Sequence, residues 1–175
     1  MNTMLKTLTG LAAFSALLVP VASQAPAGAS TASAASAVPA CTNADLVASF
    51  HHTDAGAGNR FGRLVLRNVS GHACRTGGFA GLSYVGHGNG TQIGAAASRI
   101  GGSSPVTLQP GQRAFSPVDE VVAQNYPAKT CRPTKVDGFR VYVPNSRLAQ
   151  YVPHPTTGCA NPKVHLISEK SLRKA

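Results

Sequence analysis

The sequence contains no tryptophan, and its aromatic residues make up only 6% of the chain. A hydrophobic core must therefore depend on Val, Leu and Ile, with a few Phe and Tyr residues. Charged residues are also scarce, at 13%, which is about half of their usual share. The 18 Gly and 12 Pro residues argue against long helices. The 175-residue chain is thus typical of one domain built from short strands and turns.

Acidic residues are the scarcest charged type, with 6 Asp and Glu against 16 Lys and Arg. General acid–base catalysis usually needs two carboxylates, or a carboxylate and a histidine, held close together. Asp119 and Glu120 are adjacent, so on a strand they face opposite sides. We interpret both as a solvated edge or as partners for nearby arginines. No histidine has a partner two or four positions away that indicates a ligand set. The sequence therefore predicts no catalytic residues, no metal site and no cofactor.

The first 29 residues have the pattern of a signal peptide. Lys6 supplies the positive start, residues 8–21 are apolar, and residues 27–29 fit an A-x-A cleavage site, although cleavage after Ser23 fits as well. A retained membrane anchor is the alternative, but the apolar stretch is shorter than the ~20 residues that span a bilayer. Cleavage after residue 29 removes one Lys, which leaves 15 Lys and Arg against 6 Asp and Glu and a net charge of +9.

The composition changes after the signal peptide. Residues 30–40 are rich in Ala and Ser and are predicted to form a flexible linker. The folded domain is predicted to span residues 41–168, and residues 169–175 are predicted to form a basic C-terminal tail.

The exported part of the chain contains four cysteines, at positions 41, 74, 131 and 159. An even number of cysteines in an oxidising compartment indicates disulfide bonds. No two cysteines lie as close in sequence as the paired ligands of structural zinc sites. Four cysteines allow three pairings, and the sequence alone leaves all three open.

Two predicted hairpins favour one of these pairings. Residues 139–143 and 150–152 are predicted to pair across a turn at residues 144–146, which brings Cys131 and Cys159 to the same open end.

A second predicted hairpin pairs residues 45–50 with residues 61–67 across a loop at residues 51–60. This hairpin brings Cys41 and Cys74 together. We therefore favour the bonds Cys41–Cys74 and Cys131–Cys159. Each closes a loop of about 30 residues, worth roughly 3–4 kcal/mol of stability in the chain-entropy model.

The remaining strand signals are short and are separated by turn residues. Strands are predicted at residues 82–85, 91–94, 106–108, 114–122 and 164–167, with a polar loop at residues 98–104. Asn89 and Gly90 form a strong hairpin turn signal. Pro117 places the middle of its strand at an edge or a bulge. The total of about seven to nine strands predicts an all-β, antiparallel β-sandwich.

The order of several short motifs extends over nearly the whole domain. These motifs are Cys41–Leu46, Leu64–Ser70, Cys74–Gly81, Leu108–Gly111, Cys131–Pro133, Phe139–Asn145 and Cys159 ahead of a final strand. The pattern resembles the family of exported actinobacterial proteins catalogued as domain of unknown function 4232. Ala80 departs from it, since the family tends to carry Pro in this turn. The resemblance implies an immunoglobulin-like sandwich in an extracellular or wall-associated location, and it implies no reaction.

The excess of basic residues is the strongest remaining indication of function. Arg60, Arg63 and Arg67 lie along one predicted strand or at its start, and the last two share a face, so these three are candidate polyanion-binding residues. A positive field attracts polyanions, although the charge could serve solubility alone. Aromatic residues do not interleave with the basic ones, which disfavours nucleic-acid recognition.

Our hypothesis is a secreted, monomeric, non-catalytic module that binds anionic polymers or surfaces of the cell envelope. The alternatives are a secreted protein–protein interaction domain, and an enzyme or metal-binding protein whose site is assembled from loops. A contiguous basic face would favour the first. A broad apolar patch would favour the second. A deep pocket that holds His with Asp or Glu would favour the third.

Overall fold

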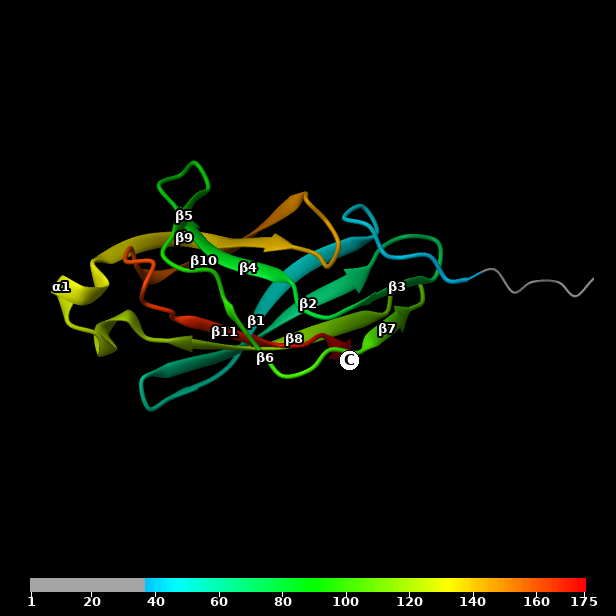
Figure 1. Cartoon of the computed structure of the whole chain (residues 1–175). Coiled ribbons are helices and arrows are strands. Elements are labelled where there is room, and N and C mark those ends of the chain that lie inside the picture. Colours follow the sequence, from blue (N-terminus) through cyan, green and yellow to red (C-terminus); the bar gives the residue numbers. More distant parts are fainter. Residues whose placement is uncertain (1–36) are drawn as a thin grey trace, which may run out of the picture. The chain divides into compact units, whose positions relative to one another are not determined.

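The computed structural model describes residues 37–175 (Figure 1). The predicted signal peptide and residues 30–36 of the predicted linker lie outside the described residues. The described part contains twelve strands and two short helices, η1 (Ala123–Asn125) and α1 (Ala128–Cys131). The predicted all-β class is confirmed, and an immunoglobulin-like topology is compatible with the arrangement. Several strands have only two to four residues, so the count exceeds the predicted seven to nine.

The larger sheet has six strands. They are β1 (Leu46–Gly56), β2 (Asn59–Asn68), β8 (Arg113–Val121), β11 (Ile167–Lys170), β6 (Ser98–Ile100) and β12 (Arg173–Lys174). The order is β1-β2-β8-β11-β6, and β12 pairs with β8 beyond the end of β11. All of its pairs are antiparallel except β11 with β6.

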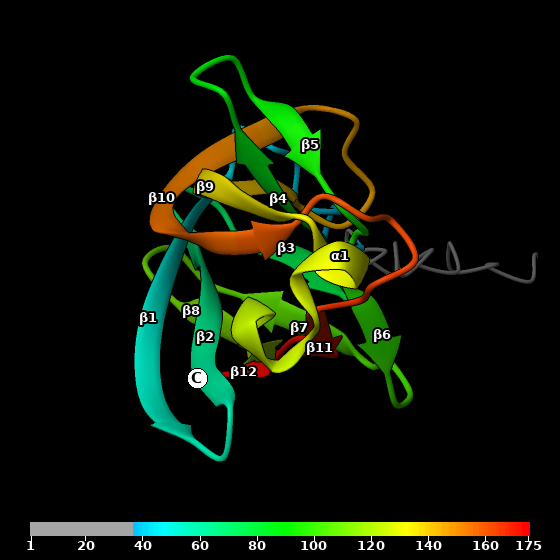
Figure 2. The ribbon, with the colours of Figure 1, turned by 90° about the vertical axis from the view of Figure 1, so that its left-hand side faces the viewer.

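The second sheet has four antiparallel strands in the order β10-β9-β4-β5. These are β10 (Ala149–Cys159), β9 (Pro133–Tyr142), β4 (Gly81–Gly86) and β5 (Thr91–Ile93). Strands β3 (Cys74–Gly77) and β7 (Pro105–Leu108) form a separate antiparallel pair. Figure 2 shows the four-stranded sheet facing the six-stranded sheet.

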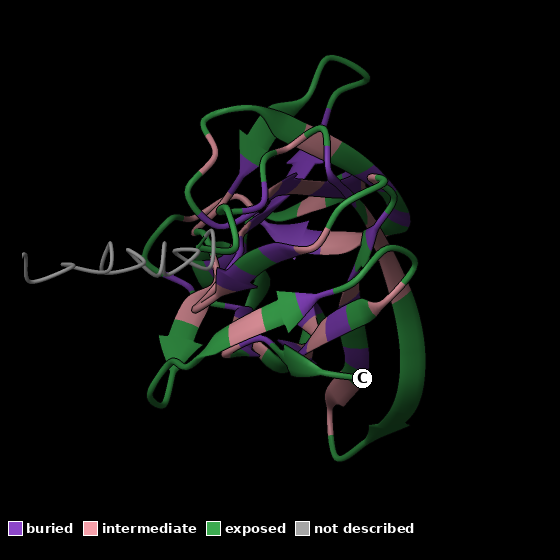
Figure 3. Ribbon diagram, turned by 90° about the vertical axis from the view of Figure 1, so that its right-hand side faces the viewer, coloured by how far each residue is buried: buried purple, intermediate pink, exposed green. Residues whose placement is uncertain are grey.

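The main core lies between the two larger sheets. Leu64 and Val118 come from the six-stranded sheet, and Tyr84, Phe139 and Val141 come from the four-stranded sheet. Along β2 and β8, buried residues alternate with exposed or half-buried ones, and Figure 3 shows buried and exposed positions mixed within the strands. This period of two is the pattern of strands with one face in a core and one face in solvent.

Two disulfides close the ends of the sandwich. Cys41 is bonded to Cys74, and Cys131 is bonded to Cys159, which is the pairing favoured by the hairpin argument. Cys41 and Cys74 belong to a second buried cluster that also contains Leu46 and Leu66. All four cysteines are therefore part of the packed interior.

The first hairpin is longer than predicted. Residues 51–60 were expected to form a loop, but β1 and β2 continue pairing until Gly56 meets Asn59. The turn consists of Ala57 and Gly58, which both have positive φ, at 49° and 77°. Two-residue turns of this kind match the twist of paired strands. The sequence signal was hidden because alanine rarely adopts positive φ.

Pro117 lies in the interior of the sheet, so its predicted place at an edge is wrong. β8 pairs with β2 along its whole length, and Arg63 lies opposite Pro117. On the other side of β8, β11 ends at Lys170 and β12 begins at Arg173. The missing N–H of the proline is tolerated because the neighbouring strand is interrupted at this point.

The C-terminal segment also differs from the prediction. Residues 169–175 were expected to be a tail, but they continue the six-stranded sheet through β11 and β12. Leu172 is buried in the second cluster, and its N–H donates to the Gly78 carbonyl at 2.7 Å. Part of the predicted polar loop at residues 98–104 likewise forms β6, which pairs with β11. Strands β6, β11 and β12 thus extend the six-stranded sheet beyond β8.

Candidate functional site

The outer face of the six-stranded sheet carries a concentration of basic side chains. Alternation along β2 buries Leu64 and Leu66 and exposes Arg63 and Arg67. The residues that line two grooves on this face include five cations, namely Arg63, Arg67, Arg113, Lys170 and Arg173. The same lining includes one acid, Asp119. We call these five cations the basic face.

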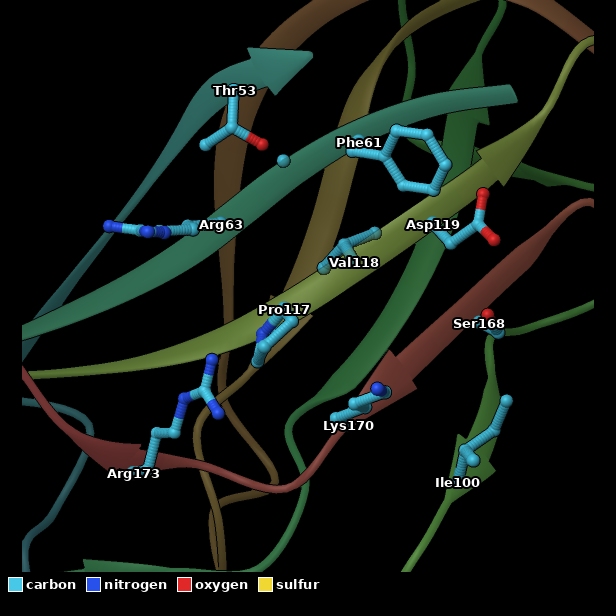
Figure 4. Close-up of a pocket in the computed structure, with 11 residues that line it drawn as sticks. Thr53, Phe61, Arg63, Ile100, Pro117, Val118, Asp119, Ser168, Lys170 and Arg173 are labelled. Atoms are coloured by element: carbon cyan, nitrogen blue, oxygen red, sulfur yellow. The ribbon is translucent and has the colours of Figure 1, made fainter. Parts of the chain in front are cut away.

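The register of the strands brings the basic face together from four strands. Arg67 lies directly opposite Arg113, so β2 and β8 contribute a pair of neighbouring cations. β11 contributes Lys170, and β12 contributes Arg173. Figure 4 shows Arg63, Lys170 and Arg173 around one of the grooves. The six-stranded sheet thus assembles charges that lie more than 100 residues apart in sequence.

The two grooves adjoin each other. One has a volume of about 370 Å³ and is lined by Arg63, Lys170 and Arg173. The other has a volume of about 540 Å³ and is lined by Arg63, Arg67 and Arg113. Both are lined by Thr53 and Arg63, which makes them neighbouring parts of one surface. Because the two grooves adjoin, together they offer an extended ligand or a surface a longer row of contacts than either groove alone.

An aromatic ring positions two of the cations. The guanidinium carbons of Arg63 and Arg173 lie 4.8 and 4.7 Å from the ring centroid of Phe115. The two arginines reach the ring from strands on opposite sides of β8. Cation–π contacts hold guanidinium groups in place while their N–H groups still face outward. Less side-chain freedom is then lost when an anion binds.

Of the three arginines predicted from the sequence to bind polyanions, two lie on the outer face of the sheet and one does not. Arg63 and Arg67 share the outer face, as the alternation indicates. Arg60 lies on the opposite side of β2, where it donates a hydrogen bond to the Thr156 hydroxyl of β10. It is therefore not part of the basic face.

Sequence reasoning missed the other three cations of the basic face. The alternation of β8, with Arg113 and Phe115 on one side, could have identified Arg113. Lys170 and Arg173 carry no such signal, because their strands have only four and two residues, too few to display an alternation.

Asp119 is the acid at the margin of the basic face, opposite Phe61 in the register of β2 and β8. Burial of its carboxyl raises the pKa of Asp119, and the neighbouring Glu120 raises it further. Both effects favour the neutral carboxylic acid.

Glu120 has a different environment from the one predicted. It is 1% exposed, and its Oε1 accepts a hydrogen bond from the Tyr84 hydroxyl. The same oxygen lies 2.9 Å from Nε2 of His154, which is 5% exposed. The interpretation of Glu120 as a solvated edge residue is therefore wrong. Sequence reasoning missed this cluster because its members come from three strands, separated by at least 34 residues.

The buried cluster is enclosed by aromatic rings. His154 stacks on Phe139 with 4.5 Å between ring centroids and 10° between planes, and Phe50 packs against both. Burial raises the pKa of the Tyr84 hydroxyl far above its usual range, so Tyr84 acts as a neutral donor. The Tyr84 hydroxyl and His154 Nε2 both contact Oε1 of Glu120, whereas its Oε2 is buried without a hydrogen-bond partner among the described residues.

The described residues 37–175 contain no group of three or more His, Cys, Asp or Glu side chains placed to hold a metal ion. Within the same residues, no helix is long and apolar enough to cross a membrane.

Fold and site together define a disulfide-bonded, antiparallel β-sandwich domain with a basic outer face. The chain belongs to the family described as domain of unknown function DUF4232, whose model matches residues 41–168. No curated protein and no solved structure gives a significant match to the chain. Membership of this family and the two disulfides fit a non-catalytic extracellular domain.

Proposed function

We propose that the domain is a secreted, non-catalytic module that associates with anionic polymers or surfaces of the cell envelope through its basic face. One observation carries the proposal: five cations and a single acid line two adjoining grooves on one sheet face. The cation–π contacts of Arg63 and Arg173 with Phe115 support the proposal, because they position both guanidinium groups before a ligand binds.

The net charge of the mature chain favours the same function. After loss of the predicted signal peptide the chain carries 15 Lys and Arg against 6 Asp and Glu. Such a balance attracts polyanions from a distance and raises their association rates. Exposed charges are screened over about 8 Å at physiological ionic strength. Binding through the basic face should therefore weaken steeply as the salt concentration rises.

Secretion is the part of the proposal that rests on residues 1–29. N-terminal sequencing of extracellular material should find a start between residues 24 and 30. Intact Met1 in secreted protein would contradict the signal-peptide assignment. The two disulfides are in keeping with an oxidising compartment.

A pull-down of the purified mature domain with envelope fractions at low and high salt tests the binding. The variant Arg63→Glu/Arg67→Glu lowers the net charge from +9 to +5 and should strongly reduce retention at low salt. The matched control, Lys129→Glu/Arg147→Glu, makes the same change in net charge at exposed positions away from the basic face. The control should retain most of the binding.

Two outcomes would reject the proposal. One is the absence of retention at low salt, and the other is retention that does not change with salt. An equal loss in the variant and the control would show that overall charge matters and the basic face does not. A secreted protein–protein interaction domain would then become the leading function.

A further inference from the structure

The basic face carries exposed apolar side chains at its margin. Val47, Phe61 and Ile100 are 51%, 37% and 49% exposed. Each lines one of the two grooves. They come from β1, β2 and β6, so they lie on different sides of the central strand β8. A face that only attracted water-soluble anions would gain nothing from solvated Phe and Ile side chains.

Each of these apolar residues has a cation as its neighbour. Val47 lies opposite Arg67 in the register of β1 and β2. Ile100 lies opposite Lys170 in the register of β6 and β11.

Phe61 precedes Arg63 by two positions on the same face of β2, and both line the groove in Figure 4. Its direct partners in the neighbouring strands are two acids, Asp54 and Asp119. Exposed apolar side chains thus lie beside cations on the basic face, and the acids gather at its Phe61 end.

This combination matches the two chemical layers of a bilayer surface. Anionic headgroups attract Lys and Arg, and side chains such as Phe and Ile enter the boundary between headgroups and acyl chains. A soluble polyanion offers only the first of these. A second copy of the chain docked face to face would place two basic faces against each other, and these would repel.

We propose that the basic face, with Val47, Phe61 and Ile100 at its margin, docks on an anionic lipid bilayer. This inference rests on the proposed function, since it names which anionic surface the same face binds. In this arrangement Arg63, Lys170 and Arg173 contact lipid phosphates. Phe61 and Ile100 enter the interfacial layer beside them. The domain lies flat on the surface, with the six-stranded sheet towards the lipid.

The test uses the mature chain and three probes. These are vesicles of phosphatidylglycerol and phosphatidylcholine in equal parts, vesicles of phosphatidylcholine alone, and dextran sulfate as a soluble polyanion. Sedimentation should show binding to the anionic vesicles and little binding to the neutral ones. The variant Val47→Ser/Phe61→Ser/Ile100→Ser should bind anionic vesicles about tenfold more weakly, because it removes the apolar contribution. Its affinity for dextran sulfate should be unchanged.

A control variant, Leu148→Ser/Tyr151→Ser, changes two exposed apolar residues outside the grooves of the basic face. It should bind vesicles like the unmodified chain. Circular dichroism must show that each variant is folded. If the triple variant is not folded, Ile100→Ser alone provides the test, because this side chain is half exposed and lies on the short strand β6.

The possible outcomes separate the two proposals. Unchanged vesicle binding by a folded Val47→Ser/Phe61→Ser/Ile100→Ser variant would overturn the lipid inference, while salt-sensitive binding to dextran sulfate would still support the proposed function. Binding to neither anionic probe would overturn both. Equal binding to neutral and anionic vesicles would remove the electrostatic basis of both.

Discussion

Both faces of strand β8 carry charged side chains, but those side chains have different surroundings on the two faces. Its inward residues are Ala114, Ser116, Val118 and Glu120, and its outward residues are Arg113, Phe115, Pro117 and Asp119. Glu120 is enclosed by Tyr84 and His154, whereas the outward Arg113 faces solvent. Inside the sandwich Glu120 is held by contacts with Tyr84 and His154, whereas the outward Arg113 remains available to ligands. Substitutions inside should therefore change the free energy of unfolding, and substitutions outside should change binding.

The strongest test of this difference is the substitution His154→Ala. It leaves the Glu120 carboxylate buried with Tyr84 as its one remaining partner and removes a ring stacked on Phe139. Loss of one member of a buried pair typically costs about 3–5 kcal/mol. Urea unfolding of the variant measures the effect. The control His51→Ala removes an exposed imidazole from the outer face and should change stability little. Equal effects at both positions would remove the distinction between the faces.

The disulfides provide the next test of the interior. Replacing Cys131 and Cys159 by Ser should lower stability by roughly 2–5 kcal/mol, because the unfolded chain regains the freedom of a long loop. The pair Cys41 and Cys74 should behave in the same way. Peptide mapping without reduction should recover these two bridges and no others. Free thiols in the oxidised, folded domain, or a Cys41–Cys159 bridge, would contradict the structure.

The buried Glu169 carboxyl should make the free energy of unfolding depend on pH. Burial raises the pKa of this carboxyl from 4.5 to about 7, although Arg99 and Ser116 oppose the shift. Between these two pH values the folded state binds more protons than the unfolded state, so the free energy of unfolding falls as pH rises. Glu169 alone accounts for a decrease of about 3 kcal/mol at most across this range. The decrease is complete above about pH 7 and absent below the unfolded pKa.

The variant Glu169→Gln isolates that contribution. A glutamine does not titrate, so the difference in stability between Glu169→Gln and the unmodified chain should shift in favour of the variant from pH 4.5 to pH 8. Urea midpoints at several pH values give the slope. A difference that is constant with pH would show that Glu169 titrates like a solvated carboxyl.

The sequence was sufficient for those features of the fold that depend on local patterns. Alternation along β2 separated Leu64 and Leu66 from Arg63 and Arg67, and hairpin symmetry favoured both disulfide pairs. Features that depend on distant segments could not be found in this way. The Tyr84–Glu120–His154 cluster joins three strands, and only the folded sheets bring its members within hydrogen-bonding distance.

The basic face shows the same division within one site. Three of its five cations, Arg63, Arg67 and Arg113, follow from the alternation of β2 and β8. The other two, Lys170 and Arg173, lie on strands of four and two residues. Strands this short have no period that a sequence can display, and they form because β8 offers a free edge on which they can pair.

Substitutions on the outer face are expected to have the smallest effect on the free energy of unfolding. Arg67→Glu should change the free energy of unfolding by less than about 0.5 kcal/mol, as is usual for exposed positions without a fixed partner. Arg63→Glu should cost slightly more, up to about 1 kcal/mol, because it also removes a cation–π contact with Phe115. Urea unfolding of both single variants checks the order. Phe115→Leu should abolish the difference between them, since Arg63 then has no ring to contact. A loss of 2 kcal/mol or more from Arg67→Glu would mean that β2 does not turn Arg67 outward, and the comparison between the two faces would fail with it.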